Sequence, residues 1–290
     1  MEERRLRLRA LIEAGEPILA PACIDAFSAR MVEQAGFEVN YLTGNGASAA
    51  ALGRPDVGLM SFREVADICR NVVQATAIPL IADADTGYGN AVNVIRTVRE
   101  MEAAGVSCIQ LEDQITPKRC GHLPGSRPVV SLEEQLGKLR AALDARRDPD
   151  FLILARTDAA ADHGLGEAIR RASAYREAGA DLTYISVEGV REELLQISRE
   201  VPGPLVALVD DTRREPAFSV EELGAMGFRI IIHPGVVRCT YLKAVGEALR
   251  ALKREGSTRS VRARMATFDE YNAALGIGEV KGWEKKYLEV

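Results

Sequence analysis

The sequence predicts an α/β fold in which eight parallel strands close into a TIM-type (β/α)8 barrel. Short apolar runs alternate with longer segments of helical periodicity along the chain. The apolar runs are rich in Val, Ile and Leu, as expected of parallel strands that are buried on both faces. Eight such runs favour a closed barrel, with an open doubly wound sheet as the alternative.

The elements follow one another at regular intervals. The expected strands are Ile18–Ile24, Phe37–Thr43, Pro79–Ala84, Cys108–Leu111, Phe151–Ala155, Leu182–Val187, Pro204–Val209 and Arg229–Ile232. The plainest expected helices are Ser61–Ala77, Ala91–Ala104, Leu132–Arg146, Gly166–Ala178 and Val220–Met226. Ser61 and Ser131 are each followed three residues later by Glu, which predicts two capping boxes. Glycines that close helices before a strand are expected at Gly36, Gly105, Gly179 and Gly227.

Beyond the eighth strand the chain continues as a helical extension. Leu242–Lys253 and Met265–Ala274 predict two further helices. No linker rich in Pro, Gly or Ser interrupts the pattern, so we expect one barrel domain over residues 1–290, with the extension at about 237–290. The only Trp, Trp283, lies in the charged tail Glu279–Tyr287, where it either packs locally or contacts a neighbouring subunit.

Composition excludes several classes of protein. The 290 residues include 37 Lys and Arg and 42 Asp and Glu, a net charge of −5 that argues against a nucleic-acid binder. No apolar run reaches the roughly 18 residues of a membrane span. The five cysteines form no close pairs, so we expect no disulfide framework. With charged residues where a signal peptide would be apolar, we expect a cytoplasmic enzyme.

Polar side chains follow nearly every expected strand. Barrel enzymes build their sites at the carboxyl ends of the strands, because the loops there converge on one opening. The residues at these ends are Asp25, Tyr41, Thr43, Gly44, Asp83, Asp85, Glu112, Asp113, Arg156, Asp158, Glu188, Asp210, Asp211 and His233. This distribution predicts an active site at that end of the barrel.

Three of these carboxylates predict a metal site. Asp83 and Asp85 are two residues apart and would project to the same side of a strand, with Glu112 on the adjacent strand. Carboxylates gathered in this way repel one another unless a cation joins them, and oxygen ligands favour Mg²⁺ or Mn²⁺. The three histidines show no close ligand spacing, which argues against zinc. Alternatively, Asp83 or Asp85 caps the helix that follows Gly89.

A basic loop around Cys120 is the second candidate for chemistry. Its residues, Lys118-Arg119-Cys120-Gly121-His122, follow the strand that ends at Glu112. Neighbouring cations favour a thiolate, which makes Cys120 a candidate acid or nucleophile. The alternative is a loop cysteine that is merely exposed.

These motifs resemble the isocitrate lyase/phosphoenolpyruvate mutase superfamily, in particular its methylisocitrate lyase and dimethylmalate lyase branch. The matching segments run in order from about residue 20 to 275, and they are Tyr41–Gly44, Leu52–Asp56, Asp83–Gly89, Glu112–Gln114, Lys118–His122 and Ala155–Ala159. The Lys-Arg-Cys-Gly-His string is the most specific, as a mark of the carbon–carbon lyases. The resemblance implies a (β/α)8 barrel, dependence on Mg²⁺, and a homotetramer, a dimer of dimers, in which C-terminal helices are exchanged between subunits.

The resemblance also implies a role for each matching position. Asp83, Asp85 and Glu112 would hold Mg²⁺, with Asp56 beside them. The amides of Thr43 and Gly44 would receive the carboxylate of a keto acid, and Arg156 would pair with substrate oxygens. Tyr41 would lie near the substrate hydroxyl, and Glu188 would support the arginine and the cysteine loop. Lys118, Cys120 and His122 would be catalytic, and Gly121 and His233 would contact substrate.

The implied reaction cleaves a 2-hydroxy di- or tricarboxylate into an α-keto acid and a carboxylate. Breaking the carbon–carbon bond leaves a carbanion, which Cys120 would protonate. Two departures lie in the substrate-selecting region. Leu208 replaces an Asn that binds the distal carboxylate of a tricarboxylate, and His233 stands where Tyr is frequent. Since Leu208 cannot hydrogen-bond a carboxylate, we expect a smaller substrate of the substituted-malate type.

Two other functions compete with the lyase. The same superfamily contains oxaloacetate decarboxylases and phosphonate enzymes of the carboxyphosphonoenolpyruvate and phosphoenolpyruvate mutase type. Those enzymes lack the cysteine string, so Cys120 and His122 favour the lyase. A barrel kept only as a binding scaffold would have lost the metal carboxylates or Cys120, and all are present.

Overall fold

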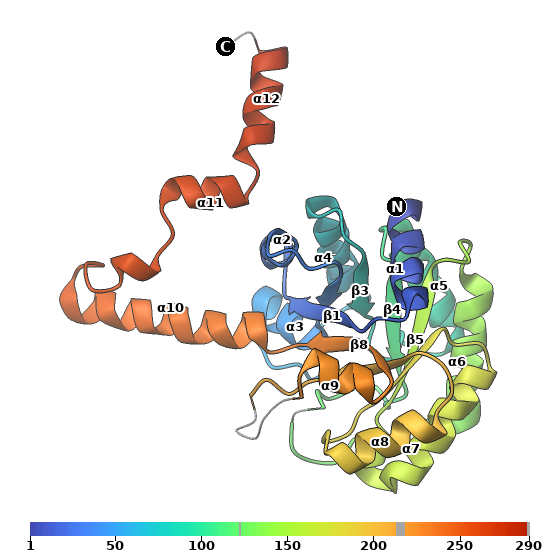
Figure 1. Cartoon of the computed structure of the whole chain (residues 1–290). Helices are drawn as coiled ribbons and strands as arrows, with labels where there is room; N and C mark the ends of the chain where they lie inside the picture. The colour runs from blue at the N-terminus through green and yellow to red at the C-terminus, as the bar shows by residue number, and fades with distance from the viewer. Residues whose placement is uncertain (122, 213–217, 289–290) are drawn as a thin grey trace.

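The structure, a computed structural model, confirms the closed barrel and describes residues 1–121, 123–212 and 218–288 (Figure 1). Eight parallel strands follow in chain order around the barrel, and β1 pairs with β8 to close it. The strands are β1 (Ile18–Cys23), β2 (Asn40–Leu42), β3 (Leu80–Asp83), β4 (Cys108–Glu112), β5 (Leu152–Thr157), β6 (Leu182–Ile185), β7 (Leu205–Leu208) and β8 (Phe228–His233). Each overlaps the strand predicted at its position.

Helices surround the barrel and extend beyond it. Those of the barrel are α1 (Glu2–Ala14), α2 (Ala26–Gln34), α3 (Gly44–Leu52), α4 (Phe62–Ala75), α5 (Ala91–Ala103), α6 (Leu132–Ala145), α7 (Ala160–Glu177), α8 (Arg191–Glu200) and α9 (Val220–Ala225). Those beyond it are α10 (Val236–Glu255), the 3-10 turn Arg262–Arg264, α11 (Phe268–Ala274) and α12 (Ile277–Tyr287). All the helices predicted from periodicity are present.

Local signals at helix ends are confirmed with one exception. Ser61 and Glu64 form the reciprocal capping box at α4, whereas Ser131 accepts a bond from the Glu134 amide without the reciprocal bond. The four glycines predicted to close helices all have positive φ. Helix α3 was not predicted, because its small residues carry no apolar periodicity.

The interior of the barrel holds one continuous apolar cluster. Residues from all eight strands contribute to it, among them Ile18, Ile81 and Leu154. Leu8 of α1 is fully buried in the same cluster, so the N-terminal helix closes one end of the barrel. Two further clusters lie between the strands and the surrounding helices. The opposite end, where the strands terminate, is left for polar side chains.

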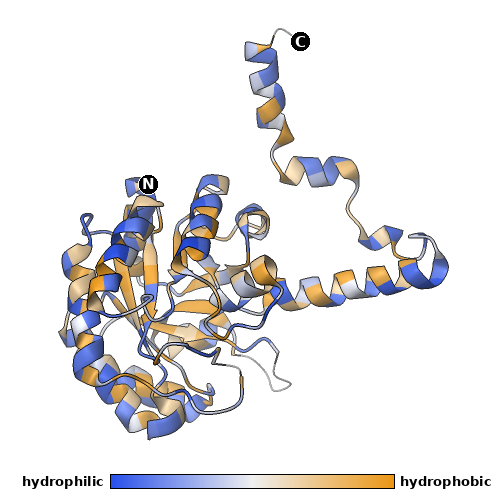
Figure 2. Ribbon diagram, turned by 180° about the vertical axis from the view of Figure 1, so that it is seen from behind, coloured by the Kyte–Doolittle hydropathy of each residue, from blue (hydrophilic) through white to orange (hydrophobic). Residues whose placement is uncertain are grey.

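The C-terminal helices form an arm, which we define as residues 236–288. Helix α10 leads away from the barrel, and α12 projects far from it (Figure 1). Helix α11 contacts α2, where Phe27 and Tyr271 stack edge to face with their ring centroids 5.9 Å apart. The arm mixes hydrophobic and hydrophilic residues (Figure 2), and its apolar side chains include Phe268 and Trp283, 78% and 54% exposed. No helix in the described part of the chain has the length and apolar character needed to cross a membrane.

Candidate active site

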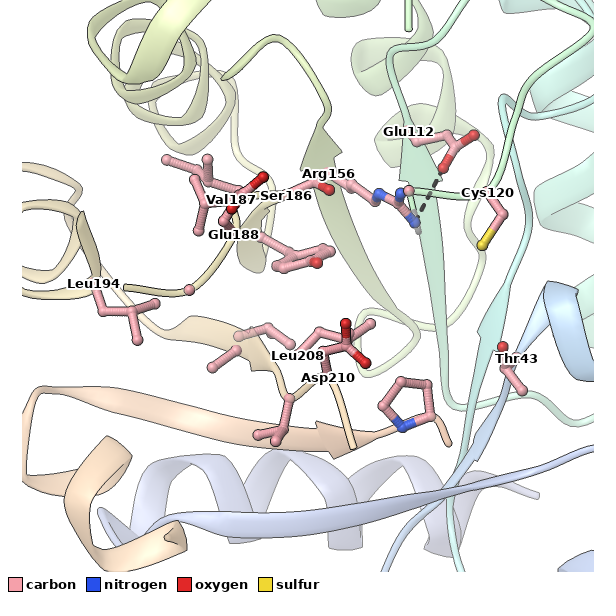
Figure 3. Close-up of a pocket in the computed structure, with 18 of the residues that line it drawn as sticks. Thr43, Glu112, Cys120, Arg156, Ser186, Val187, Glu188, Leu194, Leu208 and Asp210 are labelled. Carbon is pink, nitrogen blue, oxygen red and sulfur yellow. Dashed lines mark ion pairs between the residues drawn. The ribbon is translucent and has the colours of Figure 1, made fainter. Parts of the chain in front are cut away.

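A cavity of about 1090 Å³ opens where the strands end (Figure 3). Thr43, Glu112 and Cys120 lie toward one end of it, and Leu194 of α8 lies toward the other. The predicted site residues that line it are Tyr41, Thr43, Asp56, Asp83, Glu112, Lys118, Cys120, Gly121, Arg156 and Glu188. The strand-end prediction therefore located the cavity.

A buried ion-pair cluster forms the floor of this region. The Lys118 ammonium lies 2.6 Å from Asp56 Oδ2 and 2.8 Å from Asp85 Oδ1, with all three side chains largely buried. Asp83 accepts bonds from the Gly44 amide at 3.4 Å and from Gln110 Nε2 at 3.3 Å. Residues from the ends of β2, β3 and β4 thus meet in one group of charges.

The geometry of Asp85 differs from the prediction. Strand β3 ends at Asp83, and Asp85 lies in the following turn with φ of 48°, so the two do not alternate along one strand. Their side chains still lie near each other, since the Asp85 amide donates to Asp83 Oδ1 at 3.2 Å. The capping alternative is wrong, because Asn90 caps α5.

The buried carboxylates of this cluster have perturbed acidities. Burial raises the pKa of Asp85 to about 6, although the Lys118 ammonium opposes the shift. Burial also raises the pKa of Glu112 well above its usual value, against the opposing charge of Arg156. Glu112 Oε1 is buried without a hydrogen-bond partner. An unpartnered buried carboxylate oxygen is costly unless a cation approaches it.

The donor set fits a hard divalent cation. Carboxylates of Asp56, Asp83, Asp85 and Glu112 converge here, and Gly44 lies so close that a Cβ atom would be 2.9 Å from Asp83 Oδ2. Among the described residues, no three His, Cys, Asp or Glu side chains are arranged as a ready metal site. The Lys118 ammonium lies between Asp56 and Asp85 and balances their charge. The type of donor, carboxylate oxygen, therefore fits Mg²⁺, whereas the present positions of these side chains do not form a coordination shell.

Arg156 is held between two carboxylates. Its Nε and Nη2 donate to both oxygens of Asp158, at 2.8 and 2.9 Å, and its Nη1 lies 3.2 Å from Glu112 Oε2 (Figure 3). The ring of Tyr184 lies 5.5 Å from the guanidinium carbon. A bidentate pair of this kind fixes the plane of the guanidinium. Arg156 is thus oriented toward the cavity before any ligand arrives.

The loop carrying Cys120 is anchored on both sides. Gln114 accepts from the Arg119 amide at 2.9 Å and donates to the Arg119 carbonyl at 3.0 Å. The Cys120 amide donates to the Asp56 carbonyl at 3.0 Å, and the thiol is only 9% exposed. Its sulfur accepts a bond from Asn45 Nδ2 at 3.1 Å. Cys120 is thus a buried, cavity-lining thiol rather than an exposed one.

The basic neighbours of Cys120 contact other groups. Lys118 pairs with Asp56 and Asp85, and Arg119 Nη2 donates to the Pro124 carbonyl at 3.4 Å. His122 lies outside the described residues. The contacts of Lys118 and Arg119 are thus with other groups, and they do not support the expectation that these cations favour a thiolate at Cys120.

The remaining predicted residues differ in position. Tyr41 is buried, and burial raises its pKa, so the phenol stays neutral. Gly121 faces the arginines, where an added Cβ would lie 2.9 Å from Arg127 Nη1. Glu188 is exposed on the loop after β6, beside Ser186 and Val187 (Figure 3). His233 does not line the cavity: its Nδ1 lies 2.6 Å from Asp211 Oδ1.

Arg127, Asn45 and Arg238 are polar residues of the cavity that were not predicted. Arg127 Nη1 donates to Asp158 at 3.0 Å and to the Ser186 hydroxyl at 3.1 Å. Asn45 and Arg238 also line the cavity. Arg127 lies in the loop after the cysteine string, where an Arg is usually solvated, so only its proximity to the Arg-Thr-Asp segment in space reveals it. Leu208 and Asp210 line the cavity, as expected of the substrate-selecting region (Figure 3).

Comparisons with known proteins agree with this geometry. Residues 8–253 match the family model of phosphoenolpyruvate phosphomutase. A 2,3-dimethylmalate lyase of Eubacterium barkeri is 43% identical, over 97% of each chain. A chloroplastic carboxyvinyl-carboxyphosphonate phosphorylmutase of Arabidopsis thaliana is 40% identical, over 97% of this chain and 84% of that protein. A crystal structure of a 2,3-dimethylmalate lyase superposes with a TM-score of 0.91, at 33% identity over 98% and 95% of the two chains.

The charge cluster makes a prediction for stability. Lys118→Met leaves Asp56 and Asp85 buried without their cation, so we expect the free energy of unfolding in EDTA to fall by about 3–5 kcal/mol. Lys138→Met is the matched control, because Lys138 is equally buried but its ammonium lies 3.9 Å from Glu134, and it should change stability far less. Urea unfolding measures both. Equal losses would show that the Lys118 pairs do not hold the cluster.

Proposed function

Because the chain belongs to the phosphoenolpyruvate phosphomutase family, within the isocitrate lyase superfamily, we propose that it is a carbon–carbon lyase acting on a 2-hydroxy dicarboxylate or tricarboxylate. The products would be an α-keto acid and a carboxylate. The observation that carries the proposal is the buried Cys120 thiol, which lines the same cavity as Arg156 and the acidic cluster. A carbanion formed there would have a proton donor within the walls of its own site.

The side chains suggest which substrates fit. Arg156 and Arg127 supply two guanidinium groups, which suit the carboxylates of a diacid. Leu208 lines the same cavity and offers no hydrogen bond to a third carboxylate. We therefore favour a substituted malate, as in the name of the Eubacterium barkeri relative, over methylisocitrate.

Asp83, Asp85, Glu112 and Asp56 would hold the magnesium ion, with Mn²⁺ as a substitute. When bound, the ion would supply positive charge to the hydroxy acid and to the keto acid formed from it. The unpartnered oxygen of Glu112 and the raised pKa values of Asp85 and Glu112 support this assignment. The Lys118 ammonium, which now pairs with Asp56 and Asp85, would share the charge of these acids with the ion.

The protein's own groups would perform the remaining steps. Tyr41, neutral at physiological pH, would hydrogen-bond the substrate hydroxyl. The proton of that substrate hydroxyl would pass to a carboxylate of the acidic cluster. As the carbon–carbon bond breaks, its electron pair moves onto the carbon beside the departing carboxylate, and Arg156 stabilises the developing charge. Cys120 then transfers its proton to that carbon, leaving a thiolate. The amides of Thr43 and Gly44 and the Gly121 position would receive the keto-acid end, with Glu188 at the rim. In the structure the Thr43 amide donates to the Cys23 carbonyl at 3.3 Å, a bond that the keto acid would have to replace.

A second candidate is a phosphonate mutase or an oxaloacetate decarboxylase on the same scaffold. The Arabidopsis relative at 40% identity favours the mutase arm of this alternative. Both reactions would use the acidic cluster and Arg156, and the mutase needs no proton from Cys120. Decarboxylation leaves an enolate, which would take its proton from Cys120 or from water. The thiol therefore separates the lyase from the mutase, and cleavage of a 2-hydroxy acid rather than oxaloacetate separates the lyase from the decarboxylase.

We also propose a homotetramer, a dimer of dimers, in which the arm packs on a second copy of the chain. Phe268, Trp283 and Tyr287 are large apolar side chains left open on the arm. The five cysteines are all free, which supports a reducing compartment such as the cytoplasm. The partners we propose are a small carboxylic acid and further copies of the chain, and neither nucleic acid nor a membrane.

The lyase proposal predicts a strong effect at Cys120. Cys120→Ser should retain substrate binding while turnover falls by roughly 10²–10⁴-fold, because a hydroxyl is a much weaker acid than a thiol. Release of keto acid from a panel of 2-hydroxy di- and tricarboxylates measures this. Cys239→Ser, on α10, is the control and should keep wild-type turnover. A Cys120→Ser enzyme with undiminished turnover on its best substrate would refute the lyase.

The metal assignment predicts a separate loss. EDTA should abolish activity, and Mg²⁺ or Mn²⁺ should restore it. Asp85→Ala should weaken Mn²⁺ binding, followed by electron paramagnetic resonance, and lower activity by more than about 10-fold, since it removes a carboxylate of the cluster. Asp144→Ala, exposed on α6, serves as the control. Full activity of metal-free protein would contradict the site.

The proposed assembly has its own measurement. Light scattering at micromolar concentration should give the mass of four chains. Trp283→Ser combined with Phe268→Ser should shift that mass downward, because both substitutions remove apolar contacts of the arm. A monomeric wild-type chain would be incompatible with the proposal.

A further inference from the structure

Asn45 and Arg238 connect the thiol to a distant part of the chain. Asn45 lies in the first turn of α3, and Arg238 in the first turn of α10. Asn45 Nδ2 donates to Cys120 Sγ at 3.1 Å, and Arg238 Nη1 donates to Asn45 Oδ1 at 3.0 Å. Arg238 Nε is itself anchored on the Pro234 carbonyl at 3.0 Å. Three segments far apart in sequence thus meet in one chain of hydrogen bonds.

The arginine decides which way the amide of Asn45 points. A guanidinium has only donors, so the atom that faces Arg238 must be the amide oxygen of Asn45. The amide nitrogen then faces the sulfur and uses it as an acceptor. The two ends of an asparagine amide have nearly the same shape, so its hydrogen-bond partners decide its orientation. Arg238 therefore selects the orientation in which Asn45 donates to Cys120.

This contact constrains the proton of the thiol. Cys120 Sγ carries one hydrogen, and the Asn45 atom that faces it is the amide nitrogen, which is only a donor, because the amide oxygen is turned toward Arg238. The S–H bond must point elsewhere, and Cys120 lines the cavity. The same donor also stabilises negative charge that forms on the sulfur during proton transfer, because hydrogen bonds to charged groups are stronger than those to neutral ones.

We propose that Asn45, aligned by Arg238, is a positioning residue for the Cys120 thiol; the inference rests on the lyase function proposed above. During protonation of the product carbon the S–H bond breaks and a C–H bond forms with the electron pair left by the cleaved carbon–carbon bond. Asn45 keeps the S–H bond directed at the cavity before this step. Its amide hydrogen then stabilises the thiolate that the step leaves on Cys120.

Asn45→Asp is the sharpest variant. It preserves the size of the side chain and an acceptor for Arg238 but has no hydrogen to donate to sulfur. We expect kcat to fall by about 10–100-fold for Asn45→Asp and Asn45→Ala, with KM changed by less than about threefold. Arg238→Met, which leaves Asn45 intact but unaligned, should lower kcat by less, about three- to tenfold. Unchanged kcat in all three variants would overturn the proposal.

A double-mutant comparison tests whether Asn45 acts through the thiol. In a Cys120→Ser background, Asn45→Ala should cost less than about twofold in further turnover, because the group that it positions is gone. A loss as large as in the wild-type background would show that Asn45 acts on something other than Cys120, and would overturn the inference while leaving the lyase proposal intact.

Thiol reactivity supplies a readout that needs no substrate. Iodoacetamide at one fixed pH should alkylate Cys120 several-fold more slowly in Asn45→Asp than in wild type, with Cys239 in the same chain as the internal reference for peptide mass spectrometry. An unchanged ratio of Cys120 to Cys239 labelling would refute the contact with sulfur. If labelling slows but Cys120→Ser retains wild-type turnover, the lyase proposal is what fails, and the catalytic role given to Asn45 fails with it.

Discussion

The carboxyl end of the barrel depends on balancing buried negative charge. Asp56, Asp83, Asp85, Glu112 and Asp158 all lie at or near the ends of neighbouring strands. Four of them are buried, and the side chain of Asp85 is 13% exposed. Lys118 and Arg156 each lie between two of these acids. Without such cations the pKa values of Asp85 and Glu112, which burial already raises, would rise further. The need to balance this charge also positions the cysteine loop, because Lys118 of that loop forms ion pairs with Asp56 and Asp85 at the end of the barrel.

Another buried acid, Asp113, connects this region to the surrounding elements by hydrogen bonds. Asp113 accepts bonds from the Thr157 hydroxyl at 2.7 Å, the Tyr175 hydroxyl at 2.8 Å and the Asp158 amide at 2.9 Å. The Asp158 carboxylate in turn accepts two hydrogen bonds from Arg156. Asp113 itself does not line the cavity. It therefore acts on the site indirectly, by holding the backbone of Asp158, whose carboxylate orients Arg156.

Sequence periodicity predicted the barrel well, because burial on both faces leaves an unmistakable apolar signature in each strand. It also located Asp83, Glu112 and Arg156, since parallel strands bring their ends together. It failed where backbone geometry departs from a regular strand, as at Asp85 with its left-handed φ. It also failed where a role depends on tertiary proximity alone. Asn45 and Arg238 are 193 positions apart, and His233 is the last residue of β8 yet pairs with Asp211.

The exposed apolar side chains of the arm have a consequence for biogenesis. The arm follows the barrel in the chain, so a ribosome completes all eight strands before it releases α11 and α12. A barrel that closes on itself has no open sheet edge to pair wrongly during synthesis. The exposed apolar side chains Phe268 and Trp283 therefore emerge only when the rest of the molecule can already be folded. In the assembly proposed above, this order of emergence would separate folding of the barrel from association of the chains in time.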